Sequence, residues 1–468
     1  MNPAAAKPEH PWRANIEALT MAIVVALLFK SFVLEISKIP SGSMQPTLMG
    51  NPETGVFDRT VVDKLSFHFR DPERFEIVVF KHPLEHSRIM VKRLVGMPGE
   101  DLKIENGDLF TRAPAAQPWR ILRRPPAVQR AAWRELRGAS RGPEWSVVRA
   151  GKEWRVGSDS VVARGEGAAR FRADMGPITD SYLDGYPPSL VKSIAIRDPS
   201  WGRNPVGDVR LEGEVCVLAG TTEVSFELTE GQRTYAFVVP GPDAPAEAEI
   251  VVRIRDSATS SERVERGQHH RLAAGERVAF AVENLDDRLA LELDGETRLT
   301  AEIEASARQE ASITLGVSGA GADFEELRVS RDLWYTTPED RASWSVTIPP
   351  GHYVMLGDNT QDSADGRLWR AKTYTYRPPG SETPVQARGN YREGGENPSF
   401  GRLLDGTPAI RFRDQWGEIH WFARTAVTEE SLPGNAPLVP RDLILGRALA
   451  VFWPIRPFDR LWRVGWLH

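Results

Sequence analysis

A strict alternation of apolar and polar side chains in the middle of the chain limits its fold more than any other feature. Successive side chains of a strand point to opposite faces of a sheet, so this pattern buries one face of each strand. An Asp294-Gly295 hairpin signal follows one of these runs. Short strands separated by turns are typical of a β-sandwich or jelly roll. We therefore expect a mainly β protein with a jelly-roll-like domain over residues 206–334. Alternating positions include Val224, Phe226, Leu228, Leu289, Leu291 and Leu293.

Length and charge set further bounds on the chain. A chain of 468 residues is too long for one ordinary core, so we expect more than one domain. The formal net charge of −5 gives no reason to expect nucleic acid as a partner. Cys216 is the only cysteine, which excludes an intramolecular disulfide and a cysteine-based zinc cluster. No acidic calcium-loop motif stands out in the alternating region, and we expect neither a metal nor a cofactor.

An apolar run, from Ile16 to Leu34, lies near the N-terminus. A helix of this length, at about 1.5 Å per residue, spans a bilayer core of about 30 Å. A cleaved signal peptide and a buried core helix are the alternatives. The segment offers no convincing small-x-small cleavage site, and it precedes a polar chain. We expect a cytoplasmic N-terminus over residues 1–13 and a transmembrane anchor over residues 14–34.

Two serines follow the apolar run closely. Ser41 and Ser43 flank Gly42, with Pro40 before them and Pro46 after them. The prolines fix φ, and the glycine permits a sharply turned backbone, so a hydroxyl on this segment can be aimed at a substrate. Composition alone favours a polar turn, because Ser, Gly and Pro are common in loops. A partner base decides between the two interpretations.

Lys92 is the candidate base. It is flanked by apolar residues on a predicted strand, Ile89 to Val95. An exposed lysine has a pKa near 10.4 and is no base at neutral pH, but burial lowers the pKa because desolvation penalises the charged form. The alternative is an outward-facing, solvated lysine. His82 and His86 are the other candidates, and their segment reads as a solvated polar turn.

A third polar stretch begins at Gly357. Asp358-Asn359 and Asp365-Gly366-Arg367 suit the bracing of turns by ion pairs and side-chain to backbone bonds. By itself this stretch indicates only a polar turn.

Together the three stretches resemble bacterial signal peptidase I. The matching segments occur in the order that this family shows, and the apolar run precedes the serine motif. The resemblance covers about residues 14–110, 343–371 and 438–452, and it leaves out the two inserts. Gly366 departs from the family, which usually has Ser there. The matching motifs are Ile39-Pro40-Ser41-Gly42-Ser43-Met44, Val91-Lys92-Arg93-Leu94-Val95-Gly96-Met97-Pro98-Gly99, Gly357-Asp358-Asn359 with Ser363 to Arg367, and Gly446-Arg447-Ala448.

The resemblance assigns roles to individual residues. It implies that Ser43 is the nucleophile and Lys92 the general base, that the Ser43 backbone N–H and the Ser41 hydroxyl form an oxyanion hole, and that Ser363 orients the lysine amine. The residues expected to brace the site are Arg93, Asp358, Asp365 and Arg367. The residues expected to bind substrate, as shallow pockets for small side chains, are Ile39, Pro40, Met44, Leu48, Met90 and Val91.

The predicted domain plan has an interrupted catalytic core. The core comprises residues 36–110, 343–371 and 438–455. It is interrupted by an irregular insert over residues 111–205, by the jelly-roll-like insert over residues 206–334, which resembles concanavalin-A-like domains, and by a second irregular insert over residues 378–437.

The function that the resemblance implies is removal of signal peptides from exported preproteins, at small-x-small sites, by a serine endopeptidase. It would be anchored in the bacterial cytoplasmic membrane by a single span, with its catalytic domain on the outer face. The lipid bilayer and the preproteins are the expected partners, and the sequence names no partner for the inserts. The alternative is a membrane-tethered glycan- or protein-binding module with a vestigial peptidase core. A self-cleaving repressor-type Ser/Lys protease is disfavoured by the apolar run and the acidic charge.

Overall fold

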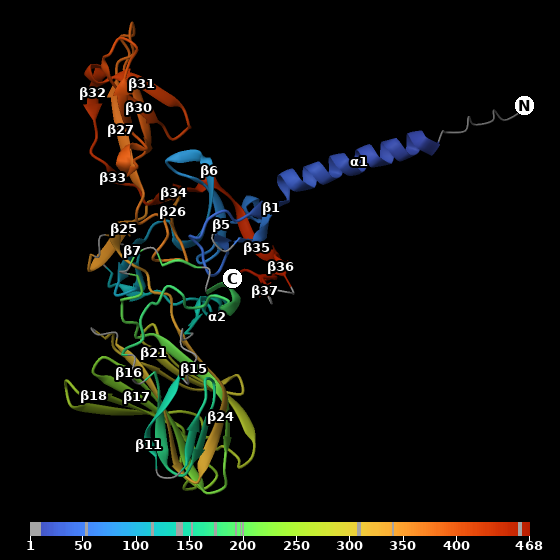
Figure 1. The fold of residues 1–468 in the computed structure, drawn as a ribbon, viewed down its shortest axis with the longest axis vertical. Coiled ribbons are helices and arrows are strands. Elements are labelled where there is room, and N and C mark those ends of the chain that lie inside the picture. The colour runs from blue at the N-terminus through green and yellow to red at the C-terminus, as the bar shows by residue number, and fades with distance from the viewer. Residues whose placement is uncertain are drawn as a thin grey trace, which may run out of the picture. The chain divides into compact units, whose positions relative to one another are not determined.

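The computed structural model describes residues 11–468, with gaps at 52–54, 114–116, 137–143, 151–152, 173–175, 192–193, 197, 199–200, 307–309, 339–340 and 457–460. Most of the expected cytoplasmic segment, residues 1–10, lies outside the described residues. The chain forms two compact units, residues 1–100 with 347–468 and residues 101–346 (Figure 1). The mainly β fold that was expected is confirmed.

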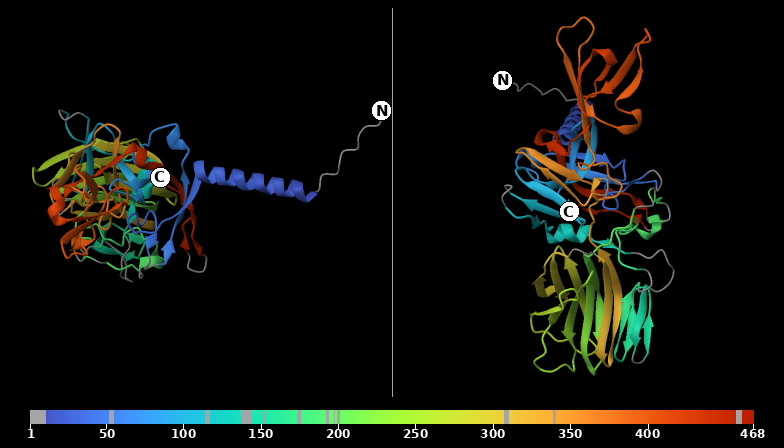
Figure 2. Two further views of the ribbon diagram at one scale, coloured as in Figure 1. Left: turned by 90° about the horizontal axis from the view of Figure 1, so that it is seen from above. Right: turned by 90° about the vertical axis from the view of Figure 1, so that its left-hand side faces the viewer.

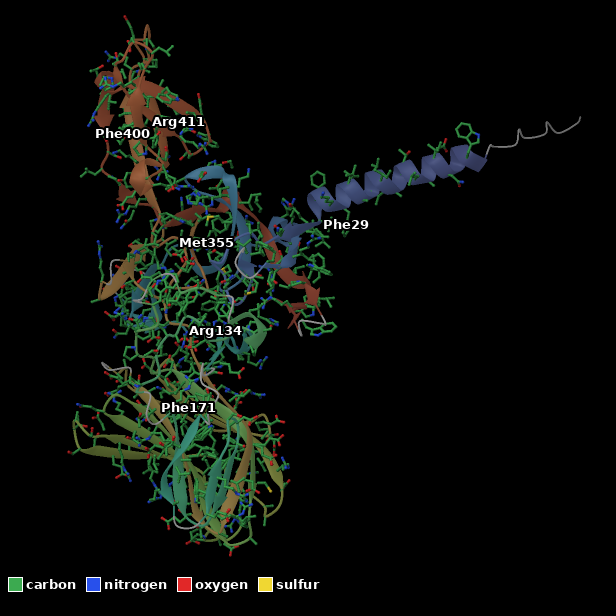
Figure 3. The ribbon with its side chains drawn as sticks, viewed as in Figure 1. Phe29, Arg134, Phe171, Met355, Phe400 and Arg411 are labelled. Carbon is green, nitrogen blue, oxygen red and sulfur yellow. The ribbon has the colours of Figure 1, made fainter. Side chains whose placement is uncertain are left out.

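The first unit begins with helix α1 (Pro11–Phe32), which leads into the first strand of the core. Long apolar side chains are exposed along it, Phe29 among them (Figure 3). Within the described residues, no helix combines the length and the apolar character needed to cross a membrane. The transmembrane anchor predicted for residues 14–34 is therefore not supported.

The catalytic core predicted from the motifs is built on one antiparallel sheet. Its order is β1-β4-β35-β5-β6-β26-β34, with β38 paired to β35. Val78, Phe80, Met90 and Leu94 pack on one face of the sheet with Trp369. The strands are β1 (Leu34–Lys38), β4 (Arg59–Asp63), β5 (Ile77–His82), β6 (Glu85–Gly96), β26 (His352–Leu356), β34 (Leu438–Pro440), β35 (Ile444–Trp453) and β38 (Gly465–Trp466). Short pairs are β2 (Gly50–Asn51) with β3 (Val56–Phe57), and β36 (Ile455–Arg456) with β37 (Leu461–Trp462).

Within the described residues, the second unit contains a sandwich of two antiparallel sheets that face each other (Figure 2). The first comprises β12 (Trp154–Val156), β13 (Val161–Arg164), β24 (Gly321–Arg331), β15 (Val209–Val217), β20 (Arg277–Leu285), β21 (Arg288–Leu293) and β22 (Glu296–Glu302), with β10 (Arg134–Glu135) paired to β24. The second comprises β11 (Trp145–Ala150), β14 (Gly167–Phe171), β23 (Ala311–Gly319), β16 (Thr221–Glu230), β17 (Arg233–Pro240), β18 (Val251–Asp256) and β19 (Ser261–Arg266).

Aromatic packing joins the two sheets. Phe226 of one sheet stacks on Phe280 of the other with ring centroids 4.4 Å apart, and Phe324 meets both rings edge-on. All three side chains are buried, and each such burial contributes about 1.5–3 kcal/mol. The alternation read from the sequence therefore corresponds to inward-facing side chains of a sandwich.

Residues 111–205 differ from the irregular insert that was expected. Their strands β10, β11, β12, β13 and β14 extend both sheets of the sandwich, which therefore includes residues from Arg134 onward and does not begin at residue 206. These strands are short, and their sequence-distant partners β23 and β24 complete them, so local periodicity is weak. The segment also contains helices α2 (Pro126–Ala132) and α3 (Pro188–Val191).

Two other segments differ from the predicted domain plan. Residues 101–110, assigned to the catalytic core, lie in the second unit, in a sheet of β25 (Ser343–Thr347), β7 (Asp101–Glu105), β8 (Asp108–Arg112) and β9 (Arg120–Ile121). Residues 378–437, expected to be irregular, form two small sheets together with the preceding residues 370–376, around buried Tyr374, Phe412 and Phe422. Their strands are β27 (Arg370–Tyr376), β28 (Val385–Asn390), β29 (Ser399–Arg402), β30 (Pro408–Arg413), β31 (Ile419–Ala423), β32 (Val427–Glu430) and β33 (Gly434–Asn435).

Candidate active site

Residues 39–48, called here the serine segment, directly follow β1 and form a series of turns. Met44 and Leu48 are buried and anchor the turn in an apolar cluster with Ile39. The hydroxyls of Ser41 and Ser43 lie 3.5 Å apart on this anchored loop. Two hydroxyl groups therefore share one small region, as an attacking oxygen and a nearby donor require.

Asn359 ties the serine segment to the turn after β26. Its side-chain Nδ2 donates to the Gly42 carbonyl over 2.9 Å, and its backbone N–H donates to the Ser43 carbonyl over 3.2 Å. The neighbouring Asp358 accepts a 2.7 Å hydrogen bond from Thr47 Oγ1. These bonds fix the backbone on both sides of the Ser43 side chain.

Gly357 lies where the serine segment meets Ser363. A Cβ placed at Gly357 would collide with the Ser43 carbonyl oxygen and with the Ser363 hydroxyl. Glycine is therefore required at this position, because atoms of Ser43 and Ser363 occupy the space that a Cβ would need. Both Ser43 and Ser363 thus border Gly357.

Lys92 is fully buried on β6, with an exposed fraction of 0%. Its Nζ donates a 3.1 Å hydrogen bond to Ser363 Oγ. Burial lowers the pKa of Lys92 to about 8; Asp365 opposes this effect and Arg367 adds to it. A lysine with such a pKa is partly neutral near pH 8 and has a lone pair available for a proton. Lys92 lies on a strand, as predicted, and the alternative of a solvated, outward-facing lysine is wrong.

Arg93 and Asp358 form a buried, two-pronged ion pair. Arg93 Nε donates to Asp358 Oδ1 over 2.8 Å and Nη2 donates to Oδ2 over 2.7 Å. The remaining Nη1 donates to the carbonyls of Phe75 and His468. Because Asp358 also holds Thr47, the pair links β6 to the serine segment.

Asp365 and Arg367 form a second buried pair beside Lys92. Arg367 Nε and Nη2 bind the two carboxylate oxygens at 2.8 and 2.7 Å, and the Gly357 N–H donates to Asp365 over 2.9 Å. Burial acts to raise the pKa of Asp365, but Arg367 and then Lys92 outweigh it and hold the pKa below its usual value. The carboxylate therefore stays charged and braces the turn around Gly357.

Gly366, where a serine was expected from the resemblance, lies tight against backbone. An added Cβ would stand 3.0 Å from the Pro437 carbonyl and 3.3 Å from the Met355 carbonyl. The absence of a side chain here suits the close approach of the segment before β34. None of the bonds described above passes through this position.

The two histidines occupy different surroundings from the lysine. His82 is buried against Trp369, not solvated as expected, and its Nδ1 accepts a hydrogen bond from the Leu84 N–H. Burial, followed by repulsion from Arg88 and Arg392, lowers the pKa of His82 to about 3. His86 packs edge-on against Trp416. Both rings have structural contacts of their own.

The expected substrate-binding residues fall into separate groups. Ile39, Met44 and Leu48 share one apolar cluster, and Val91 packs against it. Met90 belongs to a different cluster, because neighbouring residues of β6 face opposite sides of the sheet. Pro40 is exposed. The pocket assigned from the resemblance is therefore divided between two faces of β6.

Arg463 is a contact that the sequence analysis missed. Its Nη2 donates to the carbonyls of Pro46 and Thr47, both at 3.0 Å, and its Nε donates to buried Asp58 at 2.8 Å. The guanidinium thus binds two carbonyls that follow Ser43, whereas Asn359 binds the carbonyls of Gly42 and Ser43. An aromatic, basic stretch gave no signal of this role, because the partners are backbone carbonyls distant in sequence.

Comparison with known proteins places this geometry in context. Residues 12–120 match the family model of signal peptidase, peptidase S26. Probable signal peptidase I-2 of Synechocystis sp. is 35% identical over 22% of this chain and 47% of its own length. Signal peptidase I of Leptolyngbya laminosa is 37% identical over 22% and 53%, and probable signal peptidase I-1 of Synechocystis sp. is 38% identical over 25% and 65%. The chain thus spans between about half and two thirds of the length of these curated relatives.

Two solved structures are also similar to part of the chain. The galectin LEC-6 of Caenorhabditis elegans is 11% identical, covers 27% of this chain and 84% of its own, and has a TM-score of 0.22. The carbohydrate-binding module CBM66 of Bacillus subtilis is 14% identical, covers 41% and 97%, and has a TM-score of 0.25. Likenesses of this size add nothing to the description of the sandwich.

The family match covers the serine segment and the Lys92 strand, while the Ser363 turn is joined to them by hydrogen bonds. Residues 12–120 of this chain are thus similar to the peptidase S26 family of signal peptidases.

Proposed function

We propose that this chain is a serine endopeptidase that removes N-terminal signal peptides from preproteins, with Ser43 as nucleophile and Lys92 as general base. The observation that carries the proposal is the fully buried Lys92 amine on Ser363, at the turn that also holds Ser43. Burial of a lysine is costly, no carboxylate among the described residues forms an ion pair with Lys92, and titratable groups in such surroundings cluster at functional sites. The family of residues 12–120 agrees with that use.

The proposed mechanism begins with proton transfer from Ser43 Oγ to the neutral Lys92 Nζ as the oxygen attacks the scissile carbonyl. The Ser43 N–H and the Ser41 hydroxyl donate to the developing oxyanion, and loss of one such donor costs about 3–4 kcal/mol. The Lys92 ammonium then protonates the leaving amine, which departs with the mature protein. Water, deprotonated by Lys92, hydrolyses the acyl-serine and releases the signal peptide.

The free edge of β6 supports binding of an extended substrate. In the described part of the chain, β26 pairs with β6 only over Arg93–Gly96, while β5 pairs with β6 back to Glu85. The segment Ile89–Val91 therefore has an edge to which a peptide can add as a further strand. Small residues before the cleavage site fit this edge, because the adjoining cluster of Ile39 and Leu48 is closely packed.

The exposed apolar side chains of α1 support association with lipid. Leu19, Val25 and Leu27 are more than half exposed, and apolar residues occur all round the helix. Such a surface is unfavourable in water. Exposed Trp462 and Trp466 add side chains of the kind that gather at bilayer interfaces. The proposal therefore has the enzyme associated with a bacterial cytoplasmic membrane, with its core on the outer face.

The decisive experiment is cleavage of a preprotein with an Ala-x-Ala site by the purified full chain in detergent. The expected product is a mature protein with a single new N-terminus directly after the second alanine. The variant Lys92→Arg keeps the positive charge but has no neutral base, so it is expected to be inactive. Normal turnover by that variant would refute the assignment of Lys92.

A further inference from the structure

Three aspartates from separate segments of the second unit meet in one place. Asp108 begins β8, Asp208 directly precedes β15, and Asp286 lies in the turn between β20 and β21. One carboxylate oxygen from each residue lies within 4.8 Å of the others. Like charges this close repel each other strongly unless protons or a cation compensate them.

Asp286 supplies a second, independent observation at this cluster. The residue is 4% exposed, and among the described residues its Oδ2 atom is buried without a hydrogen-bond partner. Buried carboxylate oxygens are almost always paired, because desolvation is costly. Asp208 is also buried, and its Oδ2 accepts the Asp286 backbone N–H over 3.1 Å.

The nearby arginines are engaged elsewhere. Arg124 binds Asp332 over 2.7 Å, and Gln129 donates to the same carboxylate. Arg123 donates to the backbone carbonyl of Asp286 and to the Glu302 carboxylate. Neither guanidinium forms an ion pair with a carboxylate of the cluster in the described structure. Among the described residues, the three carboxylates therefore have no ion-pair partner of their own.

We propose that Asp108, Asp208 and Asp286 bind a divalent cation, Ca²⁺ in preference to Mg²⁺. Carboxylates are the ligands that hard cations take, and Ca²⁺ accepts oxygens at about 2.3–2.6 Å in flexible geometry. Oxygens up to 4.8 Å apart can thus share one Ca²⁺ between them. Mg²⁺ demands near-ideal octahedral geometry at about 2.0–2.1 Å, a stricter requirement on carboxylates that come from three separate segments.

The position of the site suggests what the ion does. Asp108 belongs to the β7–β8 hairpin, and Asp208 and Asp286 belong to the rim of the sandwich. Asn284 Nδ2 also donates to the carbonyl of Gly207, next to Asp208, which fixes the rim on the sandwich side. The ion ties the hairpin to the sandwich and so stabilises the second unit. The inference is independent of the proposed peptidase activity.

A second acidic group provides a useful contrast. Asp414, Glu418 and His420 also lie within reach of one another. Asp414 Oδ1 accepts the backbone N–H groups of Trp416 and Glu418, and Oδ2 lies 3.1 Å from His420 Nε2. These bonds account for the group as a braced turn, so no ion is proposed there.

The test uses the purified full chain, stripped with EDTA and titrated with Ca²⁺ alone by calorimetry. Thermal unfolding is recorded with Ca²⁺, with Mg²⁺ and with EDTA. Tb³⁺, a luminescent substitute for Ca²⁺, provides a local readout, because the Trp334 ring lies against Gly107, next to Asp108. The variants are Asp286→Asn and Asp208→Asn. Glu247→Gln is the matched control, since Glu247 is an exposed acid of the same sandwich.

We expect saturable Ca²⁺ binding near one ion per chain, a higher unfolding temperature with Ca²⁺ than with EDTA, and at least a tenfold loss of affinity in both aspartate variants. Glu247→Gln should bind as the unaltered chain does. Absence of saturable binding up to millimolar Ca²⁺ overturns the proposal. So does unchanged affinity in Asp286→Asn, or stabilisation by that variant without any effect of Ca²⁺, which would indicate carboxylates sharing protons. If a rim variant fails to fold, Asp108→Asn on the hairpin, together with the unaltered chain in EDTA and Ca²⁺, decides the question.

Discussion

The Lys92 ammonium donates a 3.1 Å hydrogen bond to the hydroxyl of Ser363, a residue 271 positions further along the chain. The whole second unit lies between the two in sequence. The bond is buried, so the lysine has one fixed neighbour and no contact with bulk water. Such an arrangement sets both the direction and the basicity of the amine.

Removal of either member of the proposed dyad should abolish cleavage. Ser43→Ala and Lys92→Ala are each expected to lower kcat at least about 10,000-fold, because nucleophile and base act as a unit. Preprotein cleavage measured by gel or mass spectrometry checks the loss. The matched controls are Ser87→Ala and Lys81→Ala, both exposed positions of the same sheet. Cleavage by Lys92→Ala at more than a few per cent of the normal rate would contradict the dyad.

Cleavage should rise with pH. The pKa of Lys92, lowered by burial to about 8, means that the amine is protonated and inactive below that pH and neutral above it. The kcat/KM profile should therefore climb about tenfold per pH unit at low pH and level off above about pH 8. A plateau reached below pH 6 would indicate another base.

Ser363→Ala should slow cleavage without removing the base. Loss of the hydroxyl frees the Lys92 amine to rotate, and a fall in kcat of about 100-fold or less is expected, within the range that a general base contributes. The pH profile separates this role from a purely structural one, because its midpoint should shift when Lys92 loses the hydroxyl to which its amine donates. A lower kcat with an unshifted midpoint would argue against a positioning role.

The Arg93–Asp358 pair should matter for stability as well as activity. Both side chains are at most 1% exposed, and breaking such a pair leaves a buried charge alone. Asp358→Asn is expected to lower the free energy of unfolding by about 3–5 kcal/mol. Denaturant unfolding provides the measurement. The control is Glu262→Gln, which breaks an exposed pair with Arg255 and should cost at most about 1 kcal/mol.

Gly357→Ala should inactivate the enzyme through the backbone. The new Cβ would strike the Ser43 carbonyl and the Ser363 hydroxyl, so one of the two segments must move. Misplacement of a reacting group by about 1 Å costs on the order of 100-fold in rate. Gly434→Ala is the control, since a Cβ there meets open space. Equal activity in the two variants would show that the close approach does not occur in solution.

Local pattern predicted several parts of this protein well. The alternation around Phe226 and Leu291 indicated a sandwich, because inward-facing side chains of a strand repeat every second residue. The motifs around Ser43 and Lys92 indicated the family, because chemistry depends on particular residue types at short spacings. Local pattern did not predict the strands within residues 145–171, because these short strands depend on partners far along the chain.

By itself the sequence determined the mainly β class, the likeness of residues 12–120 to the peptidase S26 family, and the residue types available for catalysis. The tertiary structure alone decided that Lys92 is buried and lies against Ser363, that Arg463 holds the serine segment, and that Met90 and Val91 face different clusters. It also brought Asp108, Asp208 and Asp286 together. The reason is physical: pKa, charge compensation and close approach depend on distances between segments, and those distances are set only when the strands pair and the side chains pack.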